Sequence, residues 1–215
     1  MSYKKLVFST FVAAITLSSS WSYAAPLNLD LTEFDPDISF SLGSVTYDAA
    51  TDQFDMTAGA DMLYSGSSDQ EISGTFFGYL GEVTLNAEIS AGGTLVGGSL
   101  SVVGDTSGSI INASGTLLTA DLFDFGFSND SQQILEFRFD PTGGELAPFY
   151  ALTPGGFGGI IISVTGYNDQ NFNTSFSGSA FGTFGDIAPI PIPASAWLFV
   201  SALFSTIGLR TRVKY

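Results

Sequence analysis

Residues 82–90 read EVTLNAEIS, and this stretch decides the fold class because apolar and polar side chains alternate along its whole length. One side of an extended chain would carry only apolar residues here: Val83, Leu85, Ala87 and Ile89. Successive side chains of a β-strand point to opposite faces, so this alternation is typical of a strand that buries one face. The stretch therefore predicts a half-buried β-strand.

The same alternation recurs along the chain, first in ILEFRFD at residues 134–140. Residues 43–60 contain two alternating runs around a polar turn, Asp48–Asp52, which predicts a β-hairpin. Between residues 25 and 186, Gly and Pro leave no uninterrupted stretch longer than 15 residues, so long helices are not expected there. Further runs with strand character lie at residues 98–104, 114–125, 158–166 and 173–184.

Many short strands separated by Gly, Ser, Asn and Asp turns predict an all-β domain, and we expect an antiparallel β-sandwich. A closed β-barrel is the alternative, because residues 94–108 carry the frequent glycines that tight barrel corners use. A β-solenoid is not expected, since we find no fixed short repeat. The sequence GGELAPFYALTPGGFGG, residues 143–159, is where we expect irregular structure.

Charge is distributed very unevenly along the chain. Its 215 residues include 21 acidic and 6 basic side chains, no His and no Cys. Five of the six bases lie near the two ends, so residues 25–186 carry a net charge of −20, from 21 acids and Arg138 alone. Such a domain would be repelled by nucleic acids and by anionic lipid surfaces. Without Cys, stability has to come from a packed apolar core, which one domain of about 160 residues can build.

The N-terminus has the order of a secretory signal peptide: two lysines, then an apolar run over residues 6–17, then small residues. Ser22 and Ala24 stand at the two positions that signal peptidase requires to be small, which predicts cleavage before Ala25. We therefore predict a signal peptide with a helical apolar run at residues 1–24, followed by an acidic extracellular domain at residues 25–186.

The C-terminus combines prolines, an apolar run and a basic tail in PIPIPASAWLFVSALFSTIGLRTRVKY, residues 189–215. Residues 194–209 form an uncharged run of 16 residues, which grows to 23 when counted from Ile187. The longer run would reach roughly 34 Å as a helix and cross a bilayer core of about 30 Å, whereas the shorter one is marginal. Because proline is tolerated in the first turn of a helix, we predict a transmembrane helix at 194–209. The bases after it predict a cytoplasmic tail, with the acidic domain outside the inner membrane.

The end of the chain resembles the PEP-CTERM sorting signal in its VPLPA variant. The resemblance covers only the last 27 residues and depends on a proline motif, an apolar segment and a basic cluster in that order: Ile190, Pro191, Ile192, Pro193 and Ala194, then Trp197, then Arg210 and Arg212. No Glu stands between the prolines, which fits the variant and leaves the enzyme subtype open.

This resemblance implies recognition by an exosortase, a membrane-embedded, transpeptidase-like enzyme of Gram-negative bacteria that make extracellular polysaccharide. It further implies cleavage near the proline motif and release of the domain or its transfer to the cell surface. A permanent single-span anchor is the alternative to a sorting signal that is removed.

The absent residue types restrict the chemistry of the domain. Without His, Cys or Lys it cannot use Ser-His-Asp or Cys-His catalysis, the usual zinc sites or a Schiff base. A glycosidase needs only two carboxyl groups about 5–9.5 Å apart. With 21 acids such pairs arise by chance, and we expect no catalytic residues. Acids lie close in the sequence in four places: Asp35 with Asp37, Asp52 with Asp55, Asp121 with Asp124, and Glu136 with Asp140.

Binding is the remaining possibility for the domain. Acidic turns at residues 29–37, 48–55 and 168–171 could supply oxygen ligands to Ca²⁺, but none matches a calcium-loop motif, so we expect no cofactor beyond weakly bound Ca²⁺ and name no metal site. Arg138 is expected to pair with acids on the same face of the sheet. Exposed aromatic side chains could stack on sugars, and the candidates are Phe76, Phe77, Tyr79, Tyr150 and Tyr167.

The sequence therefore predicts a secreted or surface-attached, non-catalytic structural or adhesive protein of the extracellular polysaccharide matrix. Its partners would be signal peptidase, an exosortase, the membrane before processing, and polysaccharide, but no nucleic acid. The alternative function is a surface polysaccharide hydrolase that uses a carboxylate pair.

Overall fold

The computed structural model describes residues 26, 27, 29, 36–128, 133–150, 157–166 and 172–187. These residues form nine strands and one short helix. In chain order the elements are β1 (Asp37–Asp48), β2 (Gln53–Ser65), β3 (Ser68–Glu71), β4 (Gly81–Ser90), β5 (Thr94–Thr106), β6 (Ala113–Phe127), β7 (Ile134–Gly143), α2 (Ala147–Tyr150), β8 (Gly158–Val164) and β9 (Phe176–Asp186).

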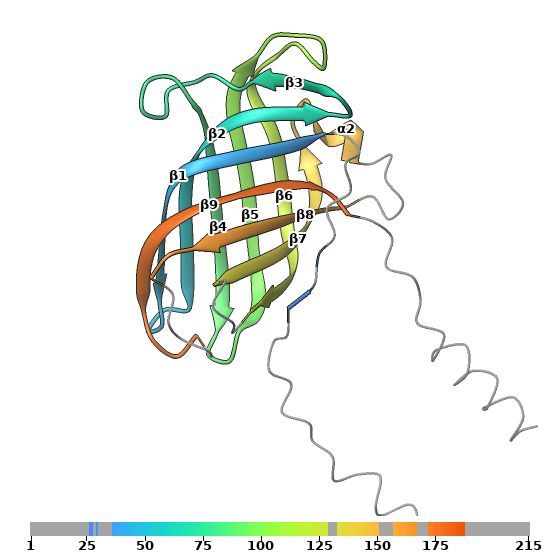
Figure 1. The fold of residues 1–215 in the computed structure, drawn as a ribbon. Coiled ribbons are helices and arrows are strands. Elements are labelled where there is room, and N and C mark those ends of the chain that lie inside the picture. Colours follow the sequence, from blue (N-terminus) through green and yellow to red (C-terminus); the bar gives the residue numbers. More distant parts are fainter. Residues whose placement is uncertain are drawn as a thin grey trace, which may run out of the picture.

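Eight of these strands close into an antiparallel β-barrel (Figure 1). Its strands follow one another in the order β1-β9-β8-β7-β6-β5-β4-β2, and β2 pairs with β1 to complete the ring. The short strand β3 pairs with the end of β2 outside this ring. The predicted β-sandwich is therefore wrong and the alternative, a closed barrel, is correct. The reason is that the first strand pairs with the last, from Ile38 with Phe184 to Tyr47 with Phe176.

The alternation in residues 82–90 is confirmed in β4. Its four apolar side chains are buried inside the barrel, while the polar residues between them face outward. The predicted hairpin is also confirmed, because β1 and β2 pair antiparallel around residues 49–52. Residues 143–159 contain the end of β7, the four-residue helix α2 and the start of β8. The expected irregular structure is therefore found among the described residues only at 144–146 and 157, and the expectation is wrong for Ala147–Tyr150.

Aromatic rings occupy the axis of the barrel. Phe54 on β2 and Phe137 on β7 come from strands on opposite sides of the ring, and their ring centroids are only 5.8 Å apart. An eight-stranded barrel is just wide enough for side chains to fill its interior, so two facing phenylalanines meet at its centre. The contact shows that this layer of the barrel is a packed core.

Phe172 closes one end of the barrel, which we call the distal end and which carries the β1–β2 and β4–β5 turns. Its ring makes edge contacts with Tyr47, Phe125 and Phe127 at centroid distances of 5.0, 5.3 and 5.2 Å. The Tyr47 hydroxyl lies 2.8 Å from the carbonyl oxygen of Ile89 and 3.0 Å from that of Phe172, so its donor has partners although the side chain is buried. Phe172 therefore acts as a plug held by rings and a hydroxyl from the barrel wall.

The opposite end, where β1 begins and β9 ends, we call the terminal end. There Tyr150 of α2 reaches into the core, packs on Phe139 and donates a hydrogen bond of 2.8 Å to the carbonyl oxygen of Pro36. The buried Gln70 side chain donates to Thr106 Oγ1 and to the carbonyl oxygen of Ile111, 2.5 Å away, and accepts from two backbone amides of the β5–β6 connection. These polar groups are buried and satisfied, so they fix the loops over this end.

The predicted flanking helices fall on residues 1–24 and 194–209, which lie outside the described residues. Among the residues that are described, no helix combines the length and the apolar character needed to cross a membrane.

Replacing Phe172 with Ala should lower the free energy of unfolding by about 3–5 kcal/mol, because it empties the plug position between buried rings. Urea unfolding followed by circular dichroism measures the change. Phe181, which is 53% exposed on β9, provides the control, and Phe181→Ala should change the value by no more than about 0.5 kcal/mol. Equal losses in the two variants would contradict the role of the plug.

Tyr150→Phe should cost about 1–2 kcal/mol at pH 7, since it leaves the Pro36 carbonyl without its buried donor. Burial, and then the charges of Asp37 and Asp186, raise the pKa of Tyr150 well above its usual value. The unfolded tyrosine ionises near pH 10, so this contribution to stability is complete below that pH and declines above it. The stability difference between wild type and variant should therefore shrink between pH 9 and 11 in thermal melts. A difference that grows with pH would contradict this assignment.

Candidate functional site

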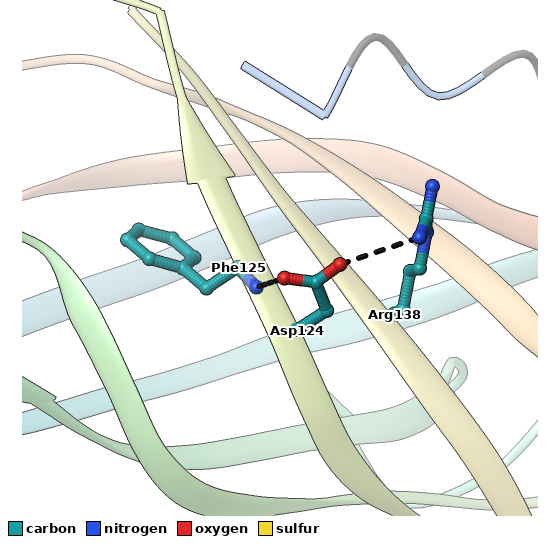
Figure 2. Close-up of polar contacts among 3 residues, drawn as sticks. All are labelled: Asp124, Phe125 and Arg138. Atoms are coloured by element: carbon teal, nitrogen blue, oxygen red, sulfur yellow. Dashed lines mark hydrogen bonds and ion pairs between the residues drawn. The ribbon is translucent and has the colours of Figure 1, made fainter. Parts of the chain in front are cut away.

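The outer face of β6 and β7 carries the domain's only base. Arg138 lies directly across from Asp124 in the register of the two strands, and its Nη1 is 3.3 Å from the Asp124 carboxylate (Figure 2). The same carboxylate accepts a hydrogen bond of 3.0 Å from the backbone amide of Phe125. The expected pairing of Arg138 with an acid is confirmed. The arrangement fixes Arg138 as a structural bridge between neighbouring strands.

The other acids of this face include Glu136 and Asp140, one of the four pairs that lie close in the sequence. Glu136 and Asp140 lie four residues apart on β7 with Arg138 between them, and their backbones are therefore about 13 Å apart. Asp121 instead lies opposite Asp140 in the β6–β7 register, where paired Cα atoms are about 4.5–5.5 Å apart. The structure thus brings together two acids that are 19 residues apart in the sequence. Two like charges in this position repel each other modestly.

The sequence neighbours Asp52 and Asp55 lie in and after the β1–β2 turn, where internal hydrogen bonds use the carboxylates. Asp55 accepts from the Asn86 side chain at 2.7 Å, and Asp52 lies 3.5 Å from the Tyr47 hydroxyl. Asp35, the sequence neighbour of Asp37, lies outside the described residues. Asp52, Asp55 and Asp124 are therefore each engaged with groups other than their sequence neighbours.

The acidic turns were also the candidates for calcium. In residues 48–55, Asp48 accepts a hydrogen bond of 3.0 Å from the backbone amide of Ala50 and lies 3.4 Å from the Ser175 hydroxyl. Residues 168–171 and most of 29–37 lie outside the described residues. Within the part of the chain that the structure describes, no three acidic residues gather in a way that could hold a metal ion. Weak binding of Ca²⁺ stays a prediction.

The five aromatic candidates have different environments. Tyr150 is completely buried, so its prediction as a sugar-stacking residue is wrong, and Tyr167 lies outside the described residues. Phe76 is half-buried. Phe77 and Tyr79 are 69% and 59% exposed, the most exposed aromatic side chains among the described residues.

These two residues form the tip of a small hairpin, Thr75–Leu80, which we call the aromatic hairpin. Phe76 and Leu80 exchange two backbone hydrogen bonds of 3.0 Å, and Gly78 N donates to the Thr75 carbonyl at the same distance. Phe77 has a φ of 49° and Gly78 a φ of 86°, so the turn passes through the left-handed region twice. The hairpin precedes β4 and therefore lies at the terminal end of the barrel.

The aromatic hairpin rests on a glycine of the barrel wall. A Cβ atom added at Gly59 would lie 2.5 Å from Leu80 Cδ1 and 3.1 Å from Phe76 Cδ1, so both side chains pack closely on this glycine and a larger residue would displace Leu80. The aromatic residues of the hairpin were among the candidates from the sequence, whereas their packing on Gly59 joins separate segments and left no local signal.

Leu29, which precedes β1, and Ile187, which follows β9, lie together on the outer face of β7 and β8. The backbone amide of Leu29 donates a hydrogen bond of 3.0 Å to the Glu136 carboxylate, whose residue is only 6% exposed. A Cβ atom at Gly159 would collide with Ile187 at 2.8 Å and with Leu29 at 3.0 Å, so both side chains pack against this glycine. Ile187 is the last described residue of the chain.

No family model, curated protein or solved structure matches this chain. The residues of the predicted sorting motif, Ile190–Ala194, Trp197, Arg210 and Arg212, lie outside the described residues, as do Ser22, Ala24 and Ala25 of the predicted signal-peptidase site.

The Asp124–Arg138 pair should be weak, because the two side chains are 40% and 16% exposed. A double-mutant cycle with Asp124→Asn and Arg138→Gln should give a coupling free energy of about 0.2–1 kcal/mol that decreases when salt is added. Urea unfolding of the four proteins at low and high NaCl measures it. A coupling that is larger and independent of salt would mean that the pair is more deeply desolvated than the exposures indicate.

Proposed function

We propose that this protein is a non-catalytic structural or adhesive component of an extracellular polysaccharide matrix, exported with a signal peptide and processed at its C-terminus by an exosortase. The sequence carries the export and sorting part of this proposal. The barrel supports the proposal in one respect, because its first strand pairs with its last and both ends of the domain therefore lie together.

The observation that carries the proposal is the pairing of β1 with β9. Because Ile38 lies opposite Phe184, the strand that follows the predicted signal peptide and the strand that precedes the predicted tail adjoin at the terminal end. The ring of strands is complete between Asp37 and Asp186. Cleavage before Ala25 and again near Pro191 would therefore remove no hydrogen bond between the strands of the barrel. This suits a domain that is cut at both ends and released folded.

The position of the proline motif fits a cleavage site. Ile190 comes only three residues after Ile187, which is 4% exposed and packs against the barrel. The prolines at 189, 191 and 193 cannot donate backbone hydrogen bonds, so they favour an extended segment beside the folded domain. A peptide bond in an extended segment is accessible to a protease.

The chemistry of the described surface suits binding better than turnover. Asp48, Asp55 and Asp124 are engaged in internal hydrogen bonds or an ion pair. The hydrolase alternative has one specific observation in its favour, the opposed carboxylates of Asp121 and Asp140.

Processing can be tested with two proline variants. Pro191→Ala combined with Pro193→Ala, inside the motif, should leave the protein in the membrane fraction with Tyr215 intact, because the recognised segment is changed. Pro189→Ala, just outside the motif, is the matched control and should be processed like wild type. Fractionation of the producing cells and mass spectrometry of the C-terminus give the readout. An intact Tyr215 in wild-type surface material would contradict the sorting proposal.

Binding and turnover can be separated on one protein sample. A glycan array should show binding to polysaccharide, and a reducing-sugar assay with the bound glycans should show no new ends. Asp121→Asn, which removes one of the opposed carboxylates, should leave both results unchanged. New reducing ends that depend on Asp121 would support the hydrolase instead.

A further inference from the structure

We propose that the aromatic hairpin is a second membrane contact, which inserts Phe77 and Tyr79 into the headgroup region of a zwitterionic lipid bilayer. The contact holds the barrel with its terminal end toward the membrane while the tail is still attached. It rests in part on the anchored stage of the proposed function and is additional to the predicted span at residues 194–209.

The hairpin presents its two rings in a fixed position. Backbone hydrogen bonds between Phe76 and Leu80 close it, and both side chains pack on Gly59 of β2. Its base is tied to β5, because Ser73 and Asp105 exchange backbone hydrogen bonds of 2.9 and 2.7 Å. The Phe76 ring also makes an edge contact with Phe77, with centroids 4.6 Å apart. Ordering before binding reduces the entropy that docking would cost.

Phe77 is an unfavourable choice for the fold alone. A bulky residue with positive φ is a genuine outlier, and asparagine or glycine would occupy the same turn with less strain. The ring is also 69% exposed, so the barrel gains little from burying it. A strained and exposed phenylalanine at the tip of an ordered hairpin is accounted for by a partner that buries the ring.

The composition of the hairpin points to an apolar partner. Residues 72–81 carry no charge, although the domain as a whole is strongly acidic. A sugar site would combine stacking rings with several polar side chains, whereas this stretch offers only the hydroxyls of Ser73, Thr75 and Tyr79, and that of Ser73 already bonds the Asp105 carbonyl. Phe and Tyr side by side suit the bilayer interface, where a ring can be buried and a hydroxyl stay wet. The flanking Glu71 and Glu82 favour lipids without net negative charge.

The length of the tail allows the contact. Six residues, 188–193, separate Ile187 from the predicted span, and an extended, proline-rich segment of this length covers roughly 19 Å. Ile187 and the hairpin both lie at the terminal end of the barrel, Ile187 beside the start of β8 and the hairpin before the start of β4. A chain anchored by residues 194–209 therefore keeps this end near the bilayer surface.

The test uses the full chain in phosphatidylcholine vesicles that contain brominated lipid, which quenches tryptophan at close range. In a background with Trp21→Phe and Trp197→Phe, Phe77→Trp places a single probe at the hairpin tip. Val96→Trp in the same background is the matched control, since Val96 is 63% exposed and lies near the β4–β5 turn at the distal end.

A separate variant, Trp21→Phe alone, keeps Trp197 as the reporter of the tail. Thermal unfolding by circular dichroism checks each fold, and Tyr79→Trp is the second probe.

We expect the Phe77→Trp variant to be quenched several-fold more strongly than the Val96→Trp variant, together with quenching of Trp197 in its own reporter background. Quenched Trp197 with unquenched probes at positions 77 and 79 would overturn this inference while leaving the predicted span intact. No quenching at any position would overturn both this inference and the predicted membrane span at residues 194–209. Equal quenching at positions 77 and 96 would mean unspecific adsorption and would also overturn it. A shift in the emission of the Phe77→Trp variant with cellohexaose, without lipid quenching, would identify the hairpin as a sugar-stacking site instead.

Discussion

The contact between Phe54 and Phe137 at the barrel axis is the interaction on which the rest of the structure depends. These side chains come from strands on opposite sides of the ring, so their meeting fixes both the diameter of the barrel and the faces that the strands turn inward. Toward the distal end, Phe125 continues the contact from Phe137 to Phe172. Because the chain has no Cys, this aromatic column stabilises the barrel without covalent links between its strands.

Because side chains fill the interior of the barrel, only its outer surface is available for binding or catalysis. The barrel wall buries Leu, Ile, Val and Phe inward and leaves its polar side chains to water, with acids in large excess. Two features of this outer surface stand out. The Arg138 bridge between β6 and β7 neutralises a charge, and the hairpin before β4 carries Phe77 and Tyr79, the most exposed aromatic side chains among the described residues. Other apolar side chains are exposed elsewhere on the barrel, among them Leu42, Val96 and Phe181.

The closure of the ring also determines where the chain ends emerge. Leu29 and Ile187 pack against the same glycine, Gly159, so the segments that lead to the predicted signal peptide and to the predicted tail start from neighbouring points on the barrel. The cleavages predicted near the two ends of the chain would therefore both take place at the terminal end of the barrel. The distal end, plugged by Phe172, is turned away from both.

Taken by itself, the sequence determined the β class, the faces of β4 and β7 and the β1–β2 hairpin, because side-chain alternation and turn residues are local properties. Export and sorting signals are likewise local and were predicted without a fold. Closure into a barrel was decided only by the tertiary structure, since the pairing of β1 with β9 joins residues nearly 150 positions apart and leaves no periodic signal. The same holds for the site. Phe77 and Tyr79 were two of five aromatic candidates in the sequence, and only the structure shows that these two are exposed and Tyr150 is buried. The approach of Asp121 to Asp140 and the support from Gly59 likewise follow from packing between distant segments.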